Sequence, residues 1–404
     1  MPANLPATST SPNSSQNSPL LIDVTRLVSR RMDGKLPTGV DRVGLEYVRY
    51  YGHRARAVIR WAGCSWVLAP AQSTELFASL LELNFAPDST KSAVPIIIRG
   101  IIAGWLKKNT EGEFLFNTGH SGLENPNYSA MLNSMGVKPL FVVHDLIPIT
   151  HPEYSRAGED KKHITRMNQL LELGSGVIAN SQATLDDLSH YAKVTDHAMP
   201  PAVVALLAPG MKNMRPERRR IDAPYFVILS TIEPRKNHVM LLQIWRRLVE
   251  TLGHQTPHLV VIGQRGWECE NAVDLLERCA ELKLFVSEIN GCSDQDLVSF
   301  LHYSQALLFP SFVEGYGMPL VEALTLGVPV IASDLPVFRE IADEIPEYID
   351  PLDGKRWIEL ITEYSLPDST RRAAQLQRIE QFKKPNWEDH FSRVDALLDQ
   401  LSAS

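Results

Sequence analysis

The chain has 404 residues, of which 44% are hydrophobic and 22% charged, and its formal net charge at pH 7 is −7. This length and apolar content suffice for two globular domains and exclude a largely disordered protein. The negative charge argues against general affinity for nucleic acid, so we expect no nucleic-acid partner. The 4 cysteines are scattered without metal-ligand spacing, which indicates a reducing cytoplasm and no disulfide framework.

Residues 1–19 are predicted to form a disordered tail. They are almost all Ser, Thr, Asn, Pro and Ala, without the basic start and apolar centre of a signal peptide. No apolar run reaches the roughly 20 residues that span a bilayer. The nearest, 94–106, is interrupted by Arg99, Gly100 and Gly104. We therefore expect a soluble or peripheral protein located in the cytoplasm.

Short apolar runs alternate with helical patterns through residues 20–208, the predicted N-terminal domain. Such alternation favours a parallel sheet with crossover helices. The expected strands are 20–24, 55–59, 140–143 and 176–179, and the expected helices are 38–50, 160–173 and 182–191.

A second series of the same kind occupies residues 223–384, the predicted C-terminal domain. A charged stretch, 209–222, separates the two series and is interpreted as a linker. Residues 385–404 contain an amphipathic helix. The predicted fold class is therefore α/β, with two Rossmann-like domains. The expected strands of the second domain are 225–229, 259–262, 284–289, 306–309 and 328–332.

A glycine-rich loop after the run 306–309 is the most informative segment of the chain. Gly315 and Gly317 permit close backbone approach, which leaves N–H groups free to bind an anion such as diphosphate at the start of a helix. Glu314 and Glu322 would repel phosphate, so we expect them to accept hydrogen bonds from sugar hydroxyls. On spacing alone, an ordinary turn followed by an exposed helical glutamate is the simpler interpretation.

The wider segment supports the functional interpretation. Residues 314–323 match the pattern E-G-[FY]-G-[LM]-P-x-x-E-A throughout, including Tyr316 and Met318. With residues 327–334 and 339–341, they resemble the donor half of retaining glycosyltransferases of family 4, of the bacterial surface-polysaccharide type. The resemblance implies the GT-B fold, in which two Rossmann-like domains face each other across a cleft. It also implies donor-binding roles for residues 314–318 and Glu322, and a terminal helix that crosses back to the first domain.

A second candidate phosphate site lies between the strand 225–229 and the following helix. The resemblance assigns Lys236 to the donor phosphates, where it balances the charge on the leaving group. Ser230 stands where many family members have an arginine, and either Arg235 replaces that arginine or Ser230 donates a neutral hydrogen bond. The alternative is a solvated helix start. Gly263 ends the next strand, in a loop that lies near the nucleotide in the family.

Loops of the N-terminal domain supply further candidates. Gly39 resembles the family's first glycine-rich loop, which borders the donor phosphates, and Asp41 or Arg42 is expected to face the acceptor. A plain helix start capped by Thr38 is equally compatible. His120 follows the apolar residues 114–116 and is a weak acceptor-side candidate.

A His-Asp pair follows the apolar run 140–143, at the carboxyl end of a strand, where α/β folds place their sites. His144 resembles the family's histidine near the donor sugar. It would bind a sugar hydroxyl or stabilise the transition state through its carbonyl group. Asp145 is an acceptor-side candidate, and a structural His-Asp pair is the alternative.

One metal-binding motif is rejected. Asp294 and Asp296 fit the Asp-x-Asp pattern, but they follow Ser293 at the start of a helix, where capping favours acidic residues. We expect no metal and no other cofactor.

The resemblance predicts transfer of a hexose, with retention, from a nucleotide diphosphate sugar to a saccharide or lipid-diphosphate-linked acceptor. The leading donor that it implies is GDP-mannose, in the synthesis of lipopolysaccharide O-antigen, capsule or exopolysaccharide. The alternatives are a sugar-nucleotide epimerase on the same frame and a non-catalytic scaffold subunit. An NAD-dependent oxidoreductase is disfavoured because no Gly-x-Gly-x-x-Gly follows an early strand.

Residues 21–60 are locally basic, with nine Lys and Arg against four acidic residues. A solvated face is the simpler interpretation. Contact with anionic lipid at the inner face of the plasma membrane, or with a lipid-diphosphate acceptor, is the alternative.

Overall fold

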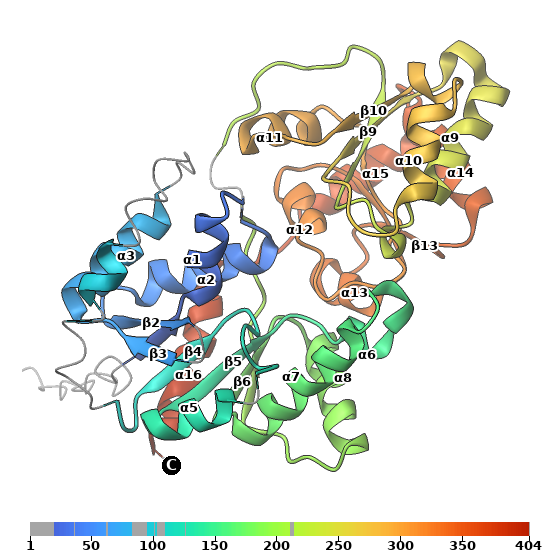
Figure 1. Ribbon diagram of the computed structural model, residues 1–404. Helices are drawn as coiled ribbons and strands as arrows, with labels where there is room; N and C mark the ends of the chain where they lie inside the picture. The colour runs from blue at the N-terminus through green and yellow to red at the C-terminus, as the bar shows by residue number, and fades with distance from the viewer. Residues whose placement is uncertain are drawn as a thin grey trace, which may run out of the picture.

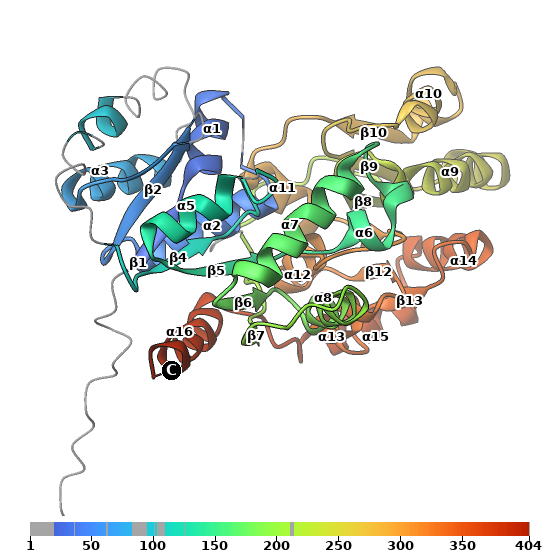
Figure 2. The same ribbon diagram turned by 60° about the horizontal axis from the view of Figure 1, so that its bottom comes forward.

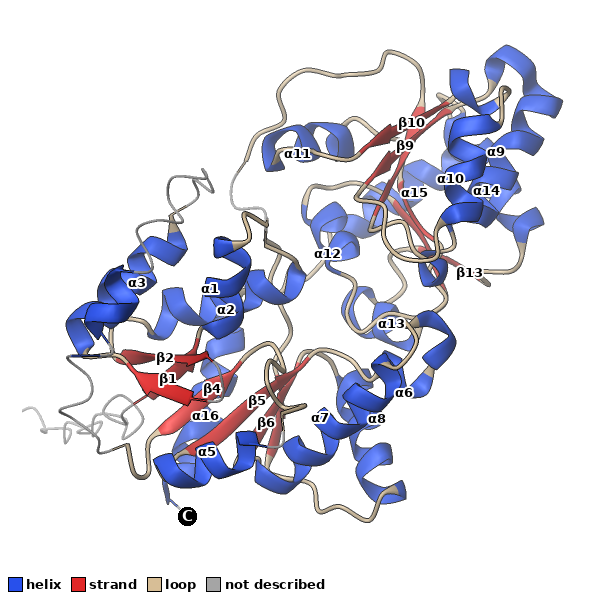
Figure 3. Cartoon of the chain, in the orientation of Figure 1, coloured by secondary structure: helices blue, strands red, loops and turns tan. Residues whose placement is uncertain are grey.

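The computed structural model describes residues 20–403 apart from 36, 62–63, 83–94, 101, 103–109, 126 and 211–213. The predicted tail, 1–19, lies outside the described residues, as do residues 94, 101 and 103–106 of the apolar run 94–106. Figure 1 shows two bodies, each built on its own sheet. Figure 3 shows each sheet lying between helices.

The N-terminal sheet has seven strands in the order β3-β2-β1-β4-β5-β6-β7. All neighbours are parallel except β3, which pairs antiparallel with β2. The central strands are buried, so their apolar runs form the middle layer of this domain. The strands are β1 Leu20–Asp23, β2 Ala55–Trp61, β3 Cys64–Val67, β4 Phe114–Asn117, β5 Lys138–Val143, β6 Gly176–Ala179 and β7 Ala202–Val204.

Helices follow these strands as crossover connections. The principal helices of this domain are α1 Thr25–Met32, α2 Gly39–Tyr51, α3 Pro70–Leu81, α5 Asn127–Met135, α6 Ile147–Thr150, α7 Glu159–Leu173 and α8 Gln182–Val194. Ser181 caps α8 by accepting a hydrogen bond from the Thr184 amide at 3.0 Å, as its sequence pattern predicts.

The C-terminal sheet is wholly parallel, in the order β10-β9-β8-β11-β12-β13. Its strands are β8 Tyr225–Leu229, β9 His258–Ile262, β10 Val286–Ile289, β11 Leu307–Phe309, β12 Val330–Ser333 and β13 Glu347–Ile349. Its principal helices are α9 His238–Leu252, α10 Glu270–Arg278, α11 Asp294–His302, α12 Met318–Thr325, α13 Pro336–Ala342, α14 Gly354–Ser365 and α15 Thr370–Ile379.

The last helix, α16 (Trp387–Ala403), packs against β6 and β7 of the first domain, and Figure 2 shows it beneath that sheet. His390 donates from Nδ1 to the Ala205 carbonyl at 3.1 Å and accepts from the Tyr47 hydroxyl at 3.0 Å. The Tyr50 ring stacks on Phe391 with centroids 4.0 Å apart. The C-terminal end of the described chain thus completes the core of the first domain.

The carboxyl ends of the two sheets meet. The hydroxyls of Ser181 and Thr184, which follow β6, donate to the carbonyl of Gly315, which follows β11, at 3.3 and 3.1 Å. Two Rossmann-like domains facing each other in this way confirm the predicted fold class. No helix in the described part of the chain is long and apolar enough to cross a membrane.

Candidate active site

The loop between β11 and α12 is tightly held. A Cβ on Gly315 would collide with the carbonyl oxygen of His144, and a Cβ on Gly317 would collide with the Phe338 ring. Gly317 also has φ 109°, which side chains rarely adopt. The Tyr316 hydroxyl donates to the Leu207 carbonyl at 2.6 Å. Gly315 is therefore required for the approach of this loop to the first domain, and Gly317 for its packing against α13.

Glu314 is buried in a cluster with two cations. Its Oε2 accepts from Arg235 Nη1 at 2.8 Å, and its Oε1 accepts from Lys236 Nζ. Burial alone would raise the pKa of Glu314, but Arg235 and Lys236 outweigh this effect and lower the pKa to about 2. Burial lowers the pKa of Lys236, and the neighbouring carboxylate opposes that effect. Arg235 also pairs with Glu233 at 2.7 Å.

This cluster joins groups that the sequence interpretation kept apart. Lys236 and Arg235 were expected to bind phosphate, and Glu314 was expected to bind sugar hydroxyls. In the structure the Glu314 carboxylate pairs with both cations. A diphosphate that bound there would pair with Arg235 and Lys236 instead. Glu314 would then accept hydrogen bonds from other groups.

Glu322 lies on the buried face of α12. Burial raises its pKa to about 7, and nearby Asp294 adds to this effect. Arg42 and the backbone N–H of Gly210 oppose it. The Glu322 carboxyl group therefore lies close to Gly210 of the linker, Arg42 at the start of α2 and Asp294 at the start of α11.

Arg42 and Asp41 have different surroundings. Arg42 Nη2 contacts Asp294 Oδ1 at 3.0 Å and so bridges the two domains. Asp41 forms a capping box with Thr38 and pairs with Arg26 and Arg30, each at 2.7 Å. Asp41 is 2% exposed, and these structural contacts occupy its carboxylate. The cap interpretation of Thr38 is confirmed, and the acceptor role expected of Asp41 receives no support.

His144 is buried at the end of β5. Its Nε2 lies 2.7 Å from the Thr118 carbonyl, which can only accept, so Nε2 carries the proton. Its own carbonyl accepts from the Asn180 amide at 2.8 Å. Burial lowers the pKa of His144, so the ring is neutral at pH 7. His144 is thus a rigid neutral group beside Gly315.

Two further histidines form a row with His144. The His120 ring lies 5.6 Å from that of His144 and 5.8 Å from that of His163, between centroids. Burial lowers the pKa of His120 strongly. Asp145 accepts from the Ile147 amide at 3.1 Å, and its carbonyl accepts from His163 Nε2 at 3.1 Å. The sequence interpretation included His120, His144 and Asp145 and missed His163, which lies within α7 without any local motif.

Two further predicted donor residues, Ser230 and Gly263, lie at the ends of β8 and β9. A Cβ on Gly263 would collide with the Ser230 carbonyl, so the two strand ends pack closely. The Ser230 hydroxyl lies 3.4 Å from His238 Nε2. Met318 is the first residue of α12.

The sequence interpretation also missed contacts that hold the two domains together. Glu340 on α13 accepts from the backbone amides of Gln182 and Ala183 at 2.6 and 3.1 Å. It thereby places a negative charge at the N-terminus of α8. The rings of Tyr154 and Phe312 stack with centroids 5.5 Å apart. No local pattern identifies these residues.

The rejected Asp-x-Asp motif lies at the start of α11. The Ser293 hydroxyl accepts from the Asp296 amide at 3.1 Å, which confirms the capping interpretation, and the Asp296 carboxylate pairs with Arg220. Among the described residues, no group of three or more His, Cys, Asp or Glu side chains is arranged to hold a metal ion.

The basic window 21–60 is largely neutralised by pairing. Arg54 pairs with Asp395 at 3.3 Å, Arg56 with Glu113 at 2.6 Å, and Arg60 with Asp23 at 2.6 Å. Most of its cations therefore have an acidic partner within the protein.

Comparison with known proteins identifies the second domain. Residues 211–365 match the family model described as "Glycosyl transferases group 1". This stretch is a group 1 glycosyltransferase domain. Its presence confirms the resemblance that residues 314–323 predict.

Relatives of this chain are named as bacterial mannosyltransferases, one of them for the O-antigen chain. A serotype-specific mannosyltransferase WbdA of Escherichia coli is 29% identical over 257 residues, which are 56% of this chain and 30% of that protein. O-antigen chain mannosyltransferase B of Escherichia coli is 31% identical over 165 residues, 41% of this chain and 43% of that protein. The chain thus spans less than half the length of either relative.

Solved structures show the same fold over the whole chain. Sucrose-phosphate synthase from Thermosynechococcus elongatus has a TM-score of 0.62 at 15% identity, covering 96% of this chain and 100% of that one. HepE from Anabaena, in complex with UDP and glucose, has a TM-score of 0.61 at 14% identity, covering 96% and 98%. The glycosyltransferase domain and its partner therefore form a GT-B fold.

Proposed function

We propose that this protein is a retaining glycosyltransferase that moves a hexose from a nucleotide diphosphate sugar to a saccharide acceptor. The observation that carries the proposal is the buried cluster of Glu314, Arg235 and Lys236 beside the N-terminus of α12, in the loop whose Gly315 meets the His144 carbonyl. The names of the relatives favour mannose, with GDP-mannose as donor, and synthesis of O-antigen, capsule or exopolysaccharide.

In this proposal the donor diphosphate binds at the start of α12, where free amides and the helix dipole favour an anion. Lys236 and Arg235 balance the charge that grows on the leaving phosphate oxygen. Glu314, released from the cations, accepts hydrogen bonds from hydroxyls of the hexose, and Glu322 accepts from hydroxyls of the donor. This chemistry requires no metal ion.

No carboxylate is placed as a covalent nucleophile in this scheme. The acceptor hydroxyl attacks the anomeric carbon on the face from which the phosphate leaves. The bond to the phosphate oxygen breaks, the new glycosidic bond forms, and that phosphate oxygen takes the acceptor proton. His144 is neutral and fixed by Thr118, so it would position a sugar hydroxyl and would not act as an acid.

The proposal places the protein in the cytoplasm, with the acceptor saccharide carried on a lipid diphosphate at the inner face of the plasma membrane. Because most cations of residues 21–60 are paired within the protein, we expect only weak, salt-sensitive attraction to anionic lipid.

The test is titration with GDP-, UDP- and dTDP-sugars, with and without EDTA, measuring thermal stabilisation and nucleotide release. We expect one nucleotide class to stabilise the protein, with no effect of EDTA, and Lys236→Ala to abolish this response. Lys355→Ala, an exposed residue on α14, is the matched control.

Other outcomes would refute the proposal in different ways. Consumption of donor without any acceptor, with a changed sugar, would indicate an epimerase. Absence of any response to all three nucleotides would indicate a scaffold subunit.

A further inference from the structure

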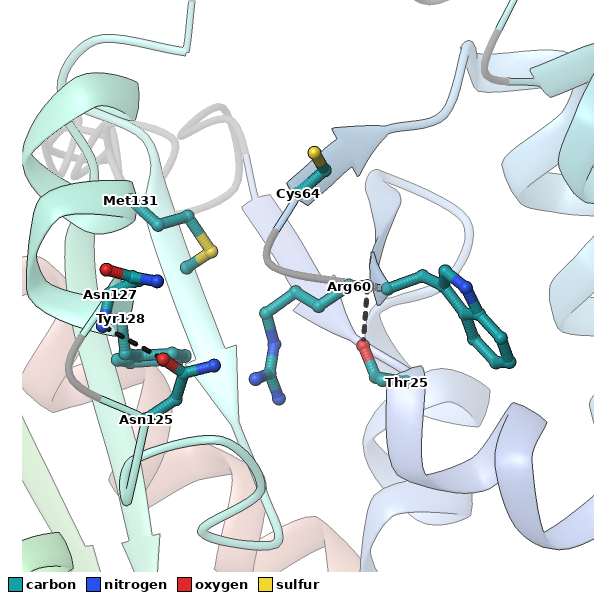
Figure 4. A pocket seen from close by; sticks show the side chains of 8 residues that line it. Thr25, Arg60, Cys64, Asn125, Asn127, Tyr128 and Met131 are labelled. Atoms are coloured by element: carbon teal, nitrogen blue, oxygen red, sulfur yellow. Dashed lines mark hydrogen bonds between the residues drawn. The ribbon is translucent and has the colours of Figure 1, made fainter.

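A pocket that none of the roles above uses lies at the edge of the first domain (Figure 4). It has a volume of about 150 Å³, which is the space of about five water molecules and suits a single sugar ring. It is formed where β1, β2 and β4 end, at the same edge of the sheet as His144. The lining residues used below are Thr25, Arg60, Trp61, Asn125, Asn127 and Tyr128.

Arg60 forms the centre of the pocket and is rigidly held. Its Nε donates to Asp23 Oδ2 at 2.6 Å, and its Nη2 donates to the Ser121 carbonyl. Its guanidinium lies 5.0 Å from the centroid of the Tyr128 ring, and its backbone amide donates to the Thr25 hydroxyl at 2.9 Å. The charge of Arg60 is therefore already compensated, which disfavours an anionic ligand.

The walls offer the groups that bind a neutral sugar. The side-chain nitrogens of Asn125 and Asn127 both point toward the space in front of Arg60 (Figure 4), while Asn125 Oδ1 accepts from the Asn127 amide at 2.9 Å. Trp61 also lines the pocket, but it follows Arg60 directly in β2, so its exposed ring points to the opposite face of the strand. The amide donors of Asn125 and Asn127 match the hydroxyls of a pyranose.

One loop connects this pocket to the proposed transfer site. The Ser121 carbonyl, which holds Arg60, also accepts from Asn117 Nδ2 at 3.1 Å. Asn117 Nδ2 in turn donates to the Tyr128 hydroxyl at 2.9 Å. In the same loop, the Thr118 carbonyl accepts from His144. Residues 117–121 thus form the boundary between the pocket and His144, on a single edge of the sheet.

We propose that this pocket binds a neutral sugar of the acceptor that does not itself react, so that the acceptor is an oligosaccharide and not a single sugar. The inference rests on the proposed function, because it places the reacting sugar near His144. The acceptor saccharide then extends past residues 117–121 to reach Asn125 and Asn127 in front of Arg60.

The experiment compares acceptors of increasing length. Neutral oligosaccharides of mannose, glucose, galactose and N-acetylglucosamine, from one to four residues, are tested with wild-type protein and with Asn125→Ala and Asn127→Ala. We expect each substitution to lower kcat/KM for the longer acceptors about 5- to 10-fold. Transfer to the monosaccharide and hydrolysis of the donor should not change. Val194→Ala, which alters an exposed apolar residue on α8 of the same domain, is the matched control.

A binding measurement separates this inference from the proposed function. Calorimetric titration of the same tetrasaccharides without donor should show binding to the wild type that Asn125→Ala and Asn127→Ala weaken, whether or not transfer occurs. Equal loss for short and long acceptors, unchanged transfer to the long ones, or tighter binding of phosphorylated than of neutral oligosaccharides would overturn the inference. Absence of donor turnover with intact oligosaccharide binding would refute only the proposed function.

Discussion

Replacing Glu322 with glutamine should stabilise the protein at alkaline pH. Burial raises the pKa of this carboxyl group from 4.5 to about 7. The difference corresponds to about 3 kcal/mol of the free energy of unfolding. Because the folded state holds this proton more tightly than the unfolded state, the stability contribution is present below pH 4.5 and is lost as the pH rises through about 7. Above that pH the wild type has to bury a charged carboxylate, whereas glutamine stays neutral and can still accept from the Gly210 amide.

Urea unfolding at pH 5 and pH 8.5 measures this effect. We expect Glu322→Gln to raise the free energy of unfolding by about 3 kcal/mol at pH 8.5 and by much less at pH 5. Glu380→Gln, at an exposed position after α15, should change neither value. An equal change from Glu322→Gln at both pH values would refute the reasoning. Since a donor hydroxyl would bind the ionised carboxylate, nucleotide binding to the wild type should also release a proton near pH 6.5, and the variant should not release it.

Other consequences of the structure are equally accessible. Glu314→Gln leaves the buried Lys236 uncompensated, so the free energy of unfolding should fall by about 3–5 kcal/mol. GDP should stabilise this variant more than the wild type, and equal stabilisation would contradict the idea that diphosphate takes the place of the carboxylate. Gly315→Ala should lower transfer about 100-fold while nucleotide binding persists, because the new Cβ collides with the His144 carbonyl and displaces the loop; loss of nucleotide binding would indicate wider damage. Burial lowers the pKa of His390 from 6.5 to about 4, so thermal stability should fall as the pH drops from about 6.5 to 4, and His390→Gln should show a smaller fall.

Much of the fold is local in the sequence and was therefore predictable. Strands with continuous apolar runs, such as Tyr225–Leu229 and Gly176–Ala179, begin and end where the pattern predicts. Strand β3 was not predicted, because Cys64–Val67 is an exposed to half-buried edge strand without an apolar run. Strand β13 was missed because Glu347–Ile349 is too short for its pattern to stand out.

Within the candidate site, too, some contacts follow from the local sequence and others depend on the fold. Glu314 and the two glycines after it lie within one short motif, so their proximity follows from the sequence. The pairing of Glu314 with Lys236 joins residues on two strand ends and depends on the order of the strands. The contact of Glu340 with the start of α8 depends on how the two domains meet, which no local pattern encodes.

The return of α16 to the first domain has a consequence for synthesis. Tyr47 and Tyr50 near the beginning of the chain find their partners in His390 and Phe391, more than 300 residues later. Of these two domains, the one whose synthesis begins earlier is therefore completed later. The glycosyltransferase domain between its two parts has left the ribosome before α16 can dock. Until then, the face of β6 and β7 that α16 covers is open to solvent, and the nascent protein is most exposed to aggregation and to chaperones at that stage.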